Sequence, residues 1–473
     1  MLDFGDNPIP LVSGQHVLDI RSGKLLIEAW DETRSLTRRI LSITRKGTGA
    51  LDCSVQRFGG ATGALSFLDL HRPQTAARSS RGSRQSFAEQ FRRMLLRQFP
   101  QWEIAALSSA MDLRRSFSAS FSRAHLHRAN QHVAALACPR IEDEPELMCA
   151  ALLWYDYLRS RLERDQSLSL CLFLPENAGN LTAHRLHWLT GRELRSRLFR
   201  FNEHGMAGEV DPQDLGNLET RLAAQVDQWP LRPELKPVLA NLSLQRGVGC
   251  CYEASGVVSI RFEGLEFARI ERDTLLLGIE SKEKLDLSQI DRVQQFISHL
   301  SNLPRSAAGA EGALPSFPER WFESAVRNHL QALDPELAPE PLHGQVLTFA
   351  GGERNLIDLL AISHSGRLAI IELKTSEDIQ LPMQGLDYWM RIRWHAERNE
   401  LQSLFPTIPV ANLLPKLLLV APALAFHPAN EIVLRYFSPG IEVERIGVNS
   451  DWEFALRVAF RLRGADLPIS HQR

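Results

Sequence analysis

Three charged residues in the last third of the chain interrupt apolar segments and could together bind a cation. Asp358 lies within Asn355–Ile362, whose other residues have the length and composition of a buried strand. Glu372 and Lys374 stand two residues apart in Leu368–Lys374, so a strand would place both on one face. A Ser-His-Ser-Gly turn between the segments predicts an antiparallel hairpin that brings Asp358 close to Glu372. Since a buried carboxylate is costly unless it is paired, hydrogen-bonded or metal-bound, two carboxylates beside an ammonium group favour a hard divalent cation.

Further polar residues stand at helical spacing on both sides of this hairpin. Gln384 and Tyr388 are four residues apart in the expected helix 377–396 and therefore share one face. Glu323 lies in the expected helix 319–333. The pattern resembles the PD-(D/E)XK nuclease superfamily, especially its RecB-like and NucS-like endonuclease branches, in which an acidic residue on a second strand precedes Glu-x-Lys on the third. Gln384-x-x-x-Tyr388 looks like a motif of the RecB-like branch, and the resemblance covers about residues 318–448.

The resemblance implies a restriction-endonuclease-like fold and metal-dependent hydrolysis of phosphodiester bonds. The residues that it makes catalytic are Asp358, Glu372, Lys374, Glu323, Gln384 and Tyr388. Asp358 and Glu372 would bind Mg²⁺ or Mn²⁺ with the backbone carbonyl of Leu373, and Lys374 would position the attacking water. Glu323 would support the metal shell, and the other two side chains would position substrate or that shell. The chain departs from the family pattern at Ile357, which stands where many members have proline.

Each of these residues also has a structural interpretation. Asp358, Glu372 and Lys374 could form an ion pair that only stabilises the fold. Gln384 and Tyr388 could belong to an ordinary amphipathic helix face, and Glu323 could be a solvated acid of its helix.

The expected elements around these residues form the order αβββαβαβ. The region comprises helix 319–333, strands 345–349, 355–362 and 367–374, helix 377–396, strand 416–420, helix 430–437 and strand 441–448. The same order is expected in residues 87–202. Sliding His132–Pro139 onto Arg367–Lys374 matches apolar positions and puts Ala137 where Glu372 stands and Pro139 where Lys374 stands. A degenerate nuclease-like domain and an unrelated α/β domain both remain open.

The chain of 473 residues is long enough for two to four domains of roughly 150 residues. We expect an α/β (α+β) protein with a β-rich module at 1–72, an α/β domain at 87–202 and an α+β connector at 203–302. The Pro-, Gly- and Ala-rich segment 303–318 is expected to be a linker before the nuclease-like domain 319–463. The Arg-rich segment His71–Ser86 has no periodicity and is expected to be a linker or mobile loop.

Charge is distributed unevenly along the chain. Residues 33–130 hold 17 Lys and Arg against five Asp and Glu, whereas the whole chain has a net charge of −2. This excess favours a polyanionic partner, although a solvated basic surface would look the same. The residues that we expect to bind nucleic acid are Arg78, Arg81, Arg84, Arg114, Arg115, Arg123 and Arg128.

Several protein classes lack support in the sequence. No apolar run approaches the roughly 18 residues of a membrane span, and the acidic start does not resemble a signal peptide, so we expect a cytoplasmic protein. The six cysteines have no CxxC spacing and are expected to be buried thiols. His125, His127 and His132 cluster without a Cys or carboxylate at metal spacing, which favours a basic surface over zinc. The GxxxxGK[ST], GxSxG and HExxH motifs are missing.

The sequence therefore predicts a metal-dependent DNA endonuclease or exonuclease. One alternative is a non-catalytic nucleic-acid-binding or assembly protein that keeps the fold, and another is a nuclease that acts on RNA. The three intact residues Asp358, Glu372 and Lys374 favour the enzyme, since a pure binding module has no need of all three. DNA is the expected partner, with no membrane, and a homodimer is left open.

Overall fold

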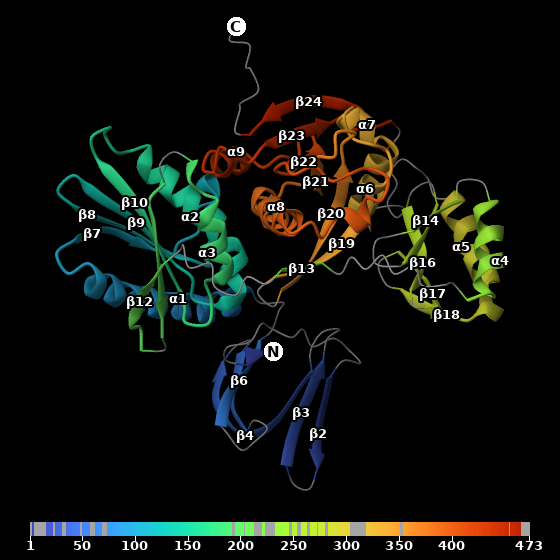
Figure 1. Cartoon of the computed structure of the whole chain (residues 1–473). Coiled ribbons are helices and arrows are strands. Elements are labelled where there is room, and N and C mark those ends of the chain that lie inside the picture. Colours follow the sequence, from blue (N-terminus) through green and yellow to red (C-terminus); the bar gives the residue numbers. More distant parts are fainter. Residues whose placement is uncertain are drawn as a thin grey trace. The chain divides into compact units, whose positions relative to one another are not determined.

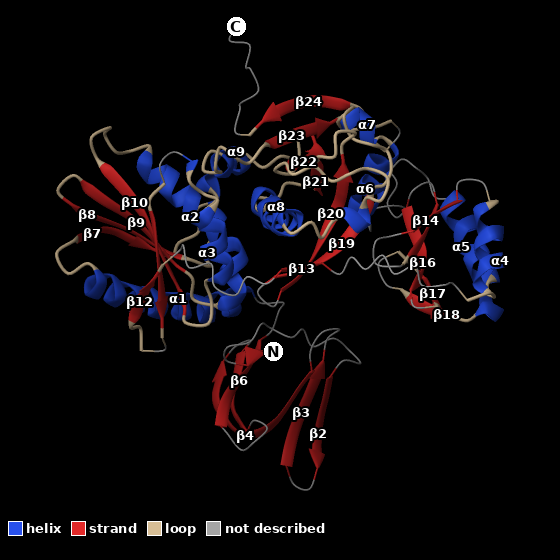
Figure 2. Cartoon of the chain, viewed as in Figure 1, coloured by secondary structure: helices blue, strands red, loops and turns tan. Residues whose placement is uncertain are grey.

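The structure is a computed structural model of the whole chain, and it divides into two compact units, Met1–Arg92 and Arg93–Arg473 (Figure 1). It describes residues 2–3, 16–21, 24–30, 35–47, 50–56, 62–68, 73–191, 194–202, 204–211, 220–222, 232–245, 248–252, 257–262, 265–271, 273–279, 282–302, 318–350, 353–453 and 455–464. This part of the chain is mixed α and β, with four sheets, as Figure 2 shows. No helix in it is long and apolar enough to cross a membrane.

The first unit contains a six-stranded antiparallel sheet in the order β1-β6-β5-β4-β3-β2. Its strands are β1 (Leu2–Asp3), β2 (His16–Arg21), β3 (Lys24–Trp30), β4 (Ser35–Gly47), β5 (Ala50–Gln56) and β6 (Thr62–Leu68). Ile27, Cys53, Val55 and Leu65 form its buried core. From β2 to β6 consecutive strands pair with each other, so this is the β-meander that the Gly-bearing turns predict.

The expected linker or loop at His71–Ser86 is wrong, because helix α1 covers Pro73–Gln98. Pro73 is the first residue of the helix, where its missing N–H is no loss, and the Arg, Gln and Ala residues that follow tolerate a helix well. Apolar periodicity begins only in the second half, where Phe91, Met94 and Leu95 are buried. A helix whose first half has no apolar face gives no periodic signal in the sequence.

The second unit begins with a six-stranded sheet in the order β12-β11-β10-β9-β8-β7. Its elements are β7 (Glu103–Ser108), β8 (Ser122–Arg128), β9 (Gln131–Ala137), α2 (Glu144–Arg159), β10 (Ser167–Pro175), α3 (Asn180–His187), β11 (Ser196–Phe201) and β12 (Ala207–Val210). We call this region the N-terminal α/β domain. With α1 before it, the expected order αβββαβαβ is present.

The C-terminal α/β domain has a seven-stranded sheet in the order β13-β19-β20-β21-β22-β23-β24. Its elements are α6 (Pro318–Asn328), α7 (Leu330–Leu333), β19 (His343–Ala350), β20 (Glu353–Ile362), β21 (Leu368–Leu373), α8 (Leu381–Glu397), β22 (Lys416–Pro422), α9 (Ala429–Leu434), β23 (Val443–Val448) and β24 (Val458–Arg463). The expected order is again found. Two strands were not expected: β24 at one edge, and β13 (Thr220–Leu222), which precedes the domain in sequence.

The sheets of the two α/β domains have the same topology. In each, the first three strands of the repeat pair antiparallel, the third and fourth pair parallel, the fourth and fifth pair parallel, and an antiparallel strand follows. Helices α2 and α8 form the equivalent crossovers, as do α3 and α9. The two α/β domains therefore share one order and one set of strand directions.

The ladders also correct the sequence alignment of the two domains by one residue. The Cys138 N–H donates to the Phe173 carbonyl (2.9 Å), and the Lys374 N–H donates to the Val420 carbonyl (3.1 Å), from the same place at the end of β9 and β21. Cys138 thus corresponds to Lys374, and Leu136, not Ala137, corresponds to Glu372. Side chains alternate between faces along a strand, so a slip of one residue changes the face, and a short apolar strand does not reveal it.

The remaining sheet of the second unit lies in the connector region, in the order β14-β15-β16-β17-β18. Its elements are α4 (Leu235–Ser243), β14 (Val248–Tyr252), β15 (Val258–Phe262), β16 (Leu265–Glu271), β17 (Thr274–Leu277), β18 (Glu283–Leu285) and α5 (Asp291–Asn302). Buried side chains such as Ile260, Phe267 and Val293 form a core of its own. The predicted linker at 303–318 falls, apart from Pro318, outside the described residues.

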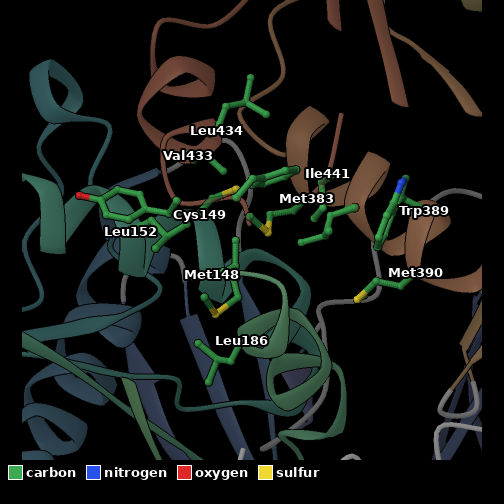
Figure 3. Packing of buried hydrophobic residues seen from close by; sticks show 14 of the residues in the cluster. Met148, Cys149, Leu152, Leu186, Met383, Trp389, Met390, Val433, Leu434 and Ile441 are labelled. Carbon is green, nitrogen blue, oxygen red and sulfur yellow. The ribbon is translucent and has the colours of Figure 1, made fainter. Parts of the chain in front are cut away.

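The N-terminal and C-terminal α/β domains share one hydrophobic core (Figure 3). Met148 of α2, Leu186 of α3, Met383 of α8 and Val433 of α9 all belong to it. The contacts are reciprocal, because α2 packs against α9 while α3 contacts α8. The two copies therefore pack through equivalent helices, as the halves of a symmetric dimer do.

Polar contacts fix the same interface. The Arg185 guanidinium in α3 donates to both carboxylate oxygens of Asp387 in α8, at 2.8 and 2.7 Å. The Tyr436 hydroxyl donates to Asp156 (2.8 Å), and the Gly191 N–H donates to the Tyr436 carbonyl (3.0 Å). A Cβ at Gly191 would lie 2.5 Å from the Arg435 carbonyl oxygen, so only glycine permits this approach. Residues of the N-terminal α/β domain thus stabilise the C-terminal α/β domain.

Candidate active site

The hairpin of β20 and β21 brings the two predicted carboxylates together. In its antiparallel register Leu359 lies opposite Ile371, and one further step along both strands leads to Asp358 and Glu372. At that point Asp358 Oδ2 accepts a hydrogen bond from the Leu373 N–H (2.9 Å). The end of β21 is thereby held by the Asp358 carboxylate. The Leu373 N–H is used in this bond, and its carbonyl is the group that the sequence predicts as a ligand.

Both carboxyl groups are strongly desolvated. Burial raises the pKa of Asp358 to about 7, against the opposing effect of the Leu373 N–H, and Glu323 adds to the rise. Burial and then the neighbouring Asp358 raise the pKa of Glu372 well above its usual value. Glu372 is 3% exposed, and its Oε2 has no hydrogen-bond partner in the described part of the chain. A cation between the two groups would remove this unfavourable burial.

Within the described residues, Lys374 lies among carboxylates without a close hydrogen-bond partner. Its Nζ is 3.9 Å from Glu372, 3.9 Å from Asp378 and 4.0 Å from Glu319, all longer than a hydrogen bond. Burial lowers the pKa of Lys374, but the carboxylates, Glu372 first, outweigh it and raise the pKa above its usual value. The side chain is therefore a protonated ammonium group, suited to stabilising negative charge and unsuited to removing a proton.

Glu323 of α6 is buried near the same place and already has partners. Its Oε1 accepts from Arg327 Nε (3.0 Å) and lies 3.9 Å from Arg261 of β15, in the connector sheet. A Cβ at Gly344 would lie 1.3 Å from Arg327 Nη2, so this glycine makes room for the guanidinium. The structure brings Glu323 close enough to affect Asp358, while two arginines hold it. Glu323 and Arg327 are four residues apart, so the sequence alone predicts that they pair along a helix. The contact of Glu323 with Arg261 has no such signal in the sequence.

Helix α8 presents the last two predicted residues to the hairpin. Burial, and then the negative charges of Glu372 and Asp358, raise the pKa of Tyr388. Gln384, one turn earlier, has a buried Oε1 without a partner in the described part of the chain. A Cβ at Gly385 would lie 2.8 Å from Leu419 Cδ2, so glycine lets α8 approach β22 closely. All six predicted catalytic residues thus lie on the hairpin or on the helices beside it.

Replacing Tyr388 with phenylalanine tests whether its hydroxyl takes part in the site. For the phosphodiester hydrolysis that the resemblance implies, we expect Tyr388→Phe to lower the rate about 10-fold to 100-fold, because the ring still packs while the positioning group is lost. The rate is measured beside the melting temperature. Tyr155→Phe is the control, since the Tyr155 hydroxyl also donates to a buried carbonyl, that of Leu168 (3.2 Å), in the other domain. If Tyr388→Phe cleaves at the wild-type rate, this face of helix α8 has only a structural role.

The predicted nucleic-acid-binding arginines differ in their surroundings. Arg78, Arg81 and Arg84 lie in α1, where the side chains of the first two are outside the described residues and Arg84 is half-buried. Arg114 and Arg128 are exposed, and Arg115 is exposed but paired with Asp112. Arg123 is buried and donates to the carbonyls of Ser118 (2.6 Å) and Ala110.

The histidine cluster and the buried cysteines offer no further site for a metal ion or a nucleophile in the described part of the chain. His125 Nε2 is 3.0 Å from His132 Nδ1, but in the described part of the chain no three His, Cys, Asp or Glu side chains are placed to hold a metal ion. Asp358 and Glu372 therefore offer two carboxylates rather than a complete side-chain set. Burial raises the pKa of Cys138, Cys149 and Cys171 to about 12, so these thiols are unreactive.

The arrangement comprises the buried carboxyl group of Glu372, the half-buried one of Asp358, an ammonium group, a phenol and a backbone carbonyl. Oxygen donors of this kind suit Mg²⁺ or Mn²⁺, and the unpartnered Glu372 Oε2 is an atom that such a cation would satisfy. Comparison of the chain with protein-family models, curated proteins and solved structures gives no match, so its function must be argued from this geometry.

Proposed function

We propose that the C-terminal α/β domain is a restriction-endonuclease-like nuclease that hydrolyses phosphodiester bonds in DNA with Mg²⁺ or Mn²⁺. One observation carries the proposal: Glu372 is buried beside Asp358 with an unpartnered oxygen, and both pKa values are raised. A pair that only stabilised the fold would be expected to hydrogen-bond to Lys374, whose Nζ instead lies 3.9 Å from Glu372.

The side chains of Asp358 and Glu372, with the Leu373 carbonyl, would hold the cation. When bound, it would act as a Lewis acid toward the phosphate and lower the pKa of a bound water. The protein positions the rest. The ammonium group of Lys374 would orient the attacking water and stabilise the negative charge that develops on the phosphate. The Tyr388 hydroxyl and the Gln384 amide would fix the carboxylates or the substrate from α8.

DNA is the substrate class that we propose, with RNA as a second outcome of the test. The basic excess of residues 33–130 favours a polyanion and does not choose between the two. Purified full-length protein is incubated with Mg²⁺, Mn²⁺ or EDTA and with single-stranded, duplex and branched DNA, and with RNA of matched sequence. Cleavage of DNA that requires metal and fails in Asp358→Asn supports the proposal. Cleavage of RNA alone would change the substrate, and binding without any cleavage would indicate a non-catalytic module.

Lys374→Met separates the role of the ammonium group from that of the carboxylates. We expect the turnover number to fall by about 10²-fold, the loss typical of one stabilising group for developing charge. Metal affinity should stay the same or rise, because a positive charge next to the cation is removed. Turnover is measured at saturating Mg²⁺, and Mn²⁺ affinity by calorimetry. An equal loss of metal binding and turnover would assign Lys374 to holding the site together.

A further inference from the structure

The strand connection beside the former site of the N-terminal α/β domain forms a separate cavity. Residues 109–121 connect β7 to β8, whereas only residues 351–352 connect the equivalent strands β19 and β20. The long connection folds back on itself through a bridge between Asp112 and Phe117 and a 3₁₀ turn at Leu113–Arg115. We call residues 109–121 the β7–β8 loop.

An arginine occupies the place that Asp358 has in the other domain. Arg123 pairs with Leu136 across β8 and β9, and Leu136 corresponds to Glu372. The Arg123 guanidinium donates to Ser118 and to Ala110, one residue in each arm of the β7–β8 loop. Leu136 and Arg123 thus stand where the other domain has Glu372 and Asp358. The Arg123 guanidinium holds the β7–β8 loop in place through its hydrogen bonds.

The loop borders an open cavity of about 600 Å³ with an aromatic wall. This volume is within the range of small-molecule sites, about 300–1,000 Å³. Phe117, Trp154 and Tyr157 line it and pack on one another, with the rings of Trp154 and Tyr157 stacked at 5.5 Å. The wall is therefore rigid, and its planar groups are fixed before any ligand arrives.

Cationic groups surround this wall. The Arg115 guanidinium lies 5.1 Å from the centre of the Tyr157 ring, and Arg161 lies 4.4 Å from it. Asp112 accepts hydrogen bonds from the Arg115 backbone (3.2 Å) and guanidinium, which fixes the guanidinium plane. Arg114 and the buried Arg123 also line the cavity. Three arginines and the carboxylate of Asp112 line the cavity, so it favours an anionic occupant.

The rim of the cavity carries two exposed apolar side chains. Leu113 is 80% exposed and Met111 is 63% exposed, and both line the cavity. Exposed large apolar side chains beside fixed guanidinium and aromatic planes offer flat surfaces to a flat ligand. A nucleobase presents such faces only when it is unpaired, and its own phosphate would meet the arginines. An acidic peptide would satisfy the charge but has no planar group for these surfaces.

We infer that this cavity binds an unpaired nucleotide of the DNA strand, with the base against Arg115, Leu113 and Met111 and a phosphate against Arg114. The inference rests on the proposed function for its choice of DNA. It gives the degenerate copy a role of its own: recognition of a single-stranded end, tail or flipped base beside the duplex.

The test is a binding measurement in EDTA, so that no cleavage takes place. Full-length protein is titrated against a blunt duplex and against duplexes with a short 5′ or 3′ tail that carries 2-aminopurine. Wild-type protein should prefer a tailed duplex and change the 2-aminopurine fluorescence, which reports stacking.

The variant with Arg115→Lys and Leu113→Ser should lose this preference by about tenfold, because lysine keeps the charge but removes the planar guanidinium group. Both side chains are exposed, so folding should be preserved. Arg164→Lys, at an exposed arginine outside the cavity, is the matched control.

Several outcomes would overturn the inference. These are a wild-type protein without preference for the tail, or a double variant that keeps both the preference and the fluorescence change. Competition by free dAMP at the same concentration as the tailed strand would make the ligand a free nucleotide. Equal competition by a glutamate-rich peptide would make it an acidic polypeptide. If the preference is present but no metal produces cleavage, the proposed hydrolysis fails while this inference stands.

Discussion

The Glu372→Gln variant is expected to lose metal-dependent cleavage by at least about a hundredfold and yet to be more heat-stable than wild type above pH 7, when no metal is present. Cleavage fails because an amide is a poor ligand for a hard cation. Stability rises because the amide has no charge to bury. The combination separates a functional site from a structural ion pair, for which the same change would lower stability.

The pH dependence follows from the raised pKa values. Burial raises the pKa of Asp358 to about 7 and that of Glu372 well above normal, whereas both would titrate near 4 in the unfolded chain. Between these values the folded protein binds more protons, so its metal-free stability falls as pH rises from about 4 through about 7. For each carboxyl group, the loss of folding stability is absent at a pH below its pKa in the unfolded chain. The loss is complete at a pH above its pKa in the folded protein.

Calorimetry in EDTA at pH 5 and pH 8 measures this effect. The melting temperature of Glu372→Gln, relative to wild type, should be higher at pH 8 than at pH 5. Adding Mg²⁺ at pH 8 should stabilise wild type and leave the variant unchanged. Glu336→Gln is the control, because Glu336 is an exposed carboxylate of the same domain. A Glu372→Gln variant that is less stable than wild type at both pH values would contradict the proposed site.

Arg185→Met is expected to produce the largest loss of stability in the second unit, about 3–5 kcal/mol. The side chains of Arg185 and Asp387 are 3% and 10% exposed, and the guanidinium also donates to the Pro145 carbonyl (2.6 Å). Removing the arginine leaves the Asp387 carboxylate buried without its partner. The double variant Arg185→Met with Asp387→Leu should recover much of the loss, since neither charge is then buried alone.

Urea unfolding of the four proteins in this cycle gives the coupling energy. The exposed pair Arg197–Glu209 provides a matched control, with the same kind of contact at 2.7 Å and side chains 43% and 48% exposed. Removing Arg197 should cost no more than about 1 kcal/mol. Equal losses at the two pairs would mean that the interface between the α/β domains contributes little. Asp387 precedes Tyr388 in α8, so Arg185→Met should also reduce cleavage through the position of that helix.

The sequence predicts the order of elements well where strands are buried on both faces. The runs around Ile357, Ile370 and Leu418 are long, apolar and bounded by turn residues, and each forms a strand. The positions of Asp358 and Glu372 on neighbouring strands follow from the same pattern. Helix α1 escapes prediction, because a helix without an apolar stripe in its first half resembles a loop.

Features that depend on distant contacts are not predictable in this way. Strand β13 is three residues long and pairs with β19 more than a hundred residues later. The partners of Glu323 and Asp387, namely Arg261 and Arg185, lie in other domains, and no local spacing identifies them. The residue-by-residue correspondence of β9 and β21 follows from the backbone hydrogen bonds that each strand makes to its own neighbour, and these leave no trace in an apolar sequence.

The paired arrangement of the two α/β domains has a consequence for how DNA would be broken. A symmetric dimer of nuclease domains carries two sets of carboxylates, one for each strand of a duplex. In this chain the equivalents of Asp358 and Glu372 are Arg123 and Leu136, so the described parts of the two α/β domains hold a single set between them. A chain that hydrolyses DNA with this set would nick one strand per encounter. A double-strand break would then need a second molecule, or a second encounter from the opposite strand.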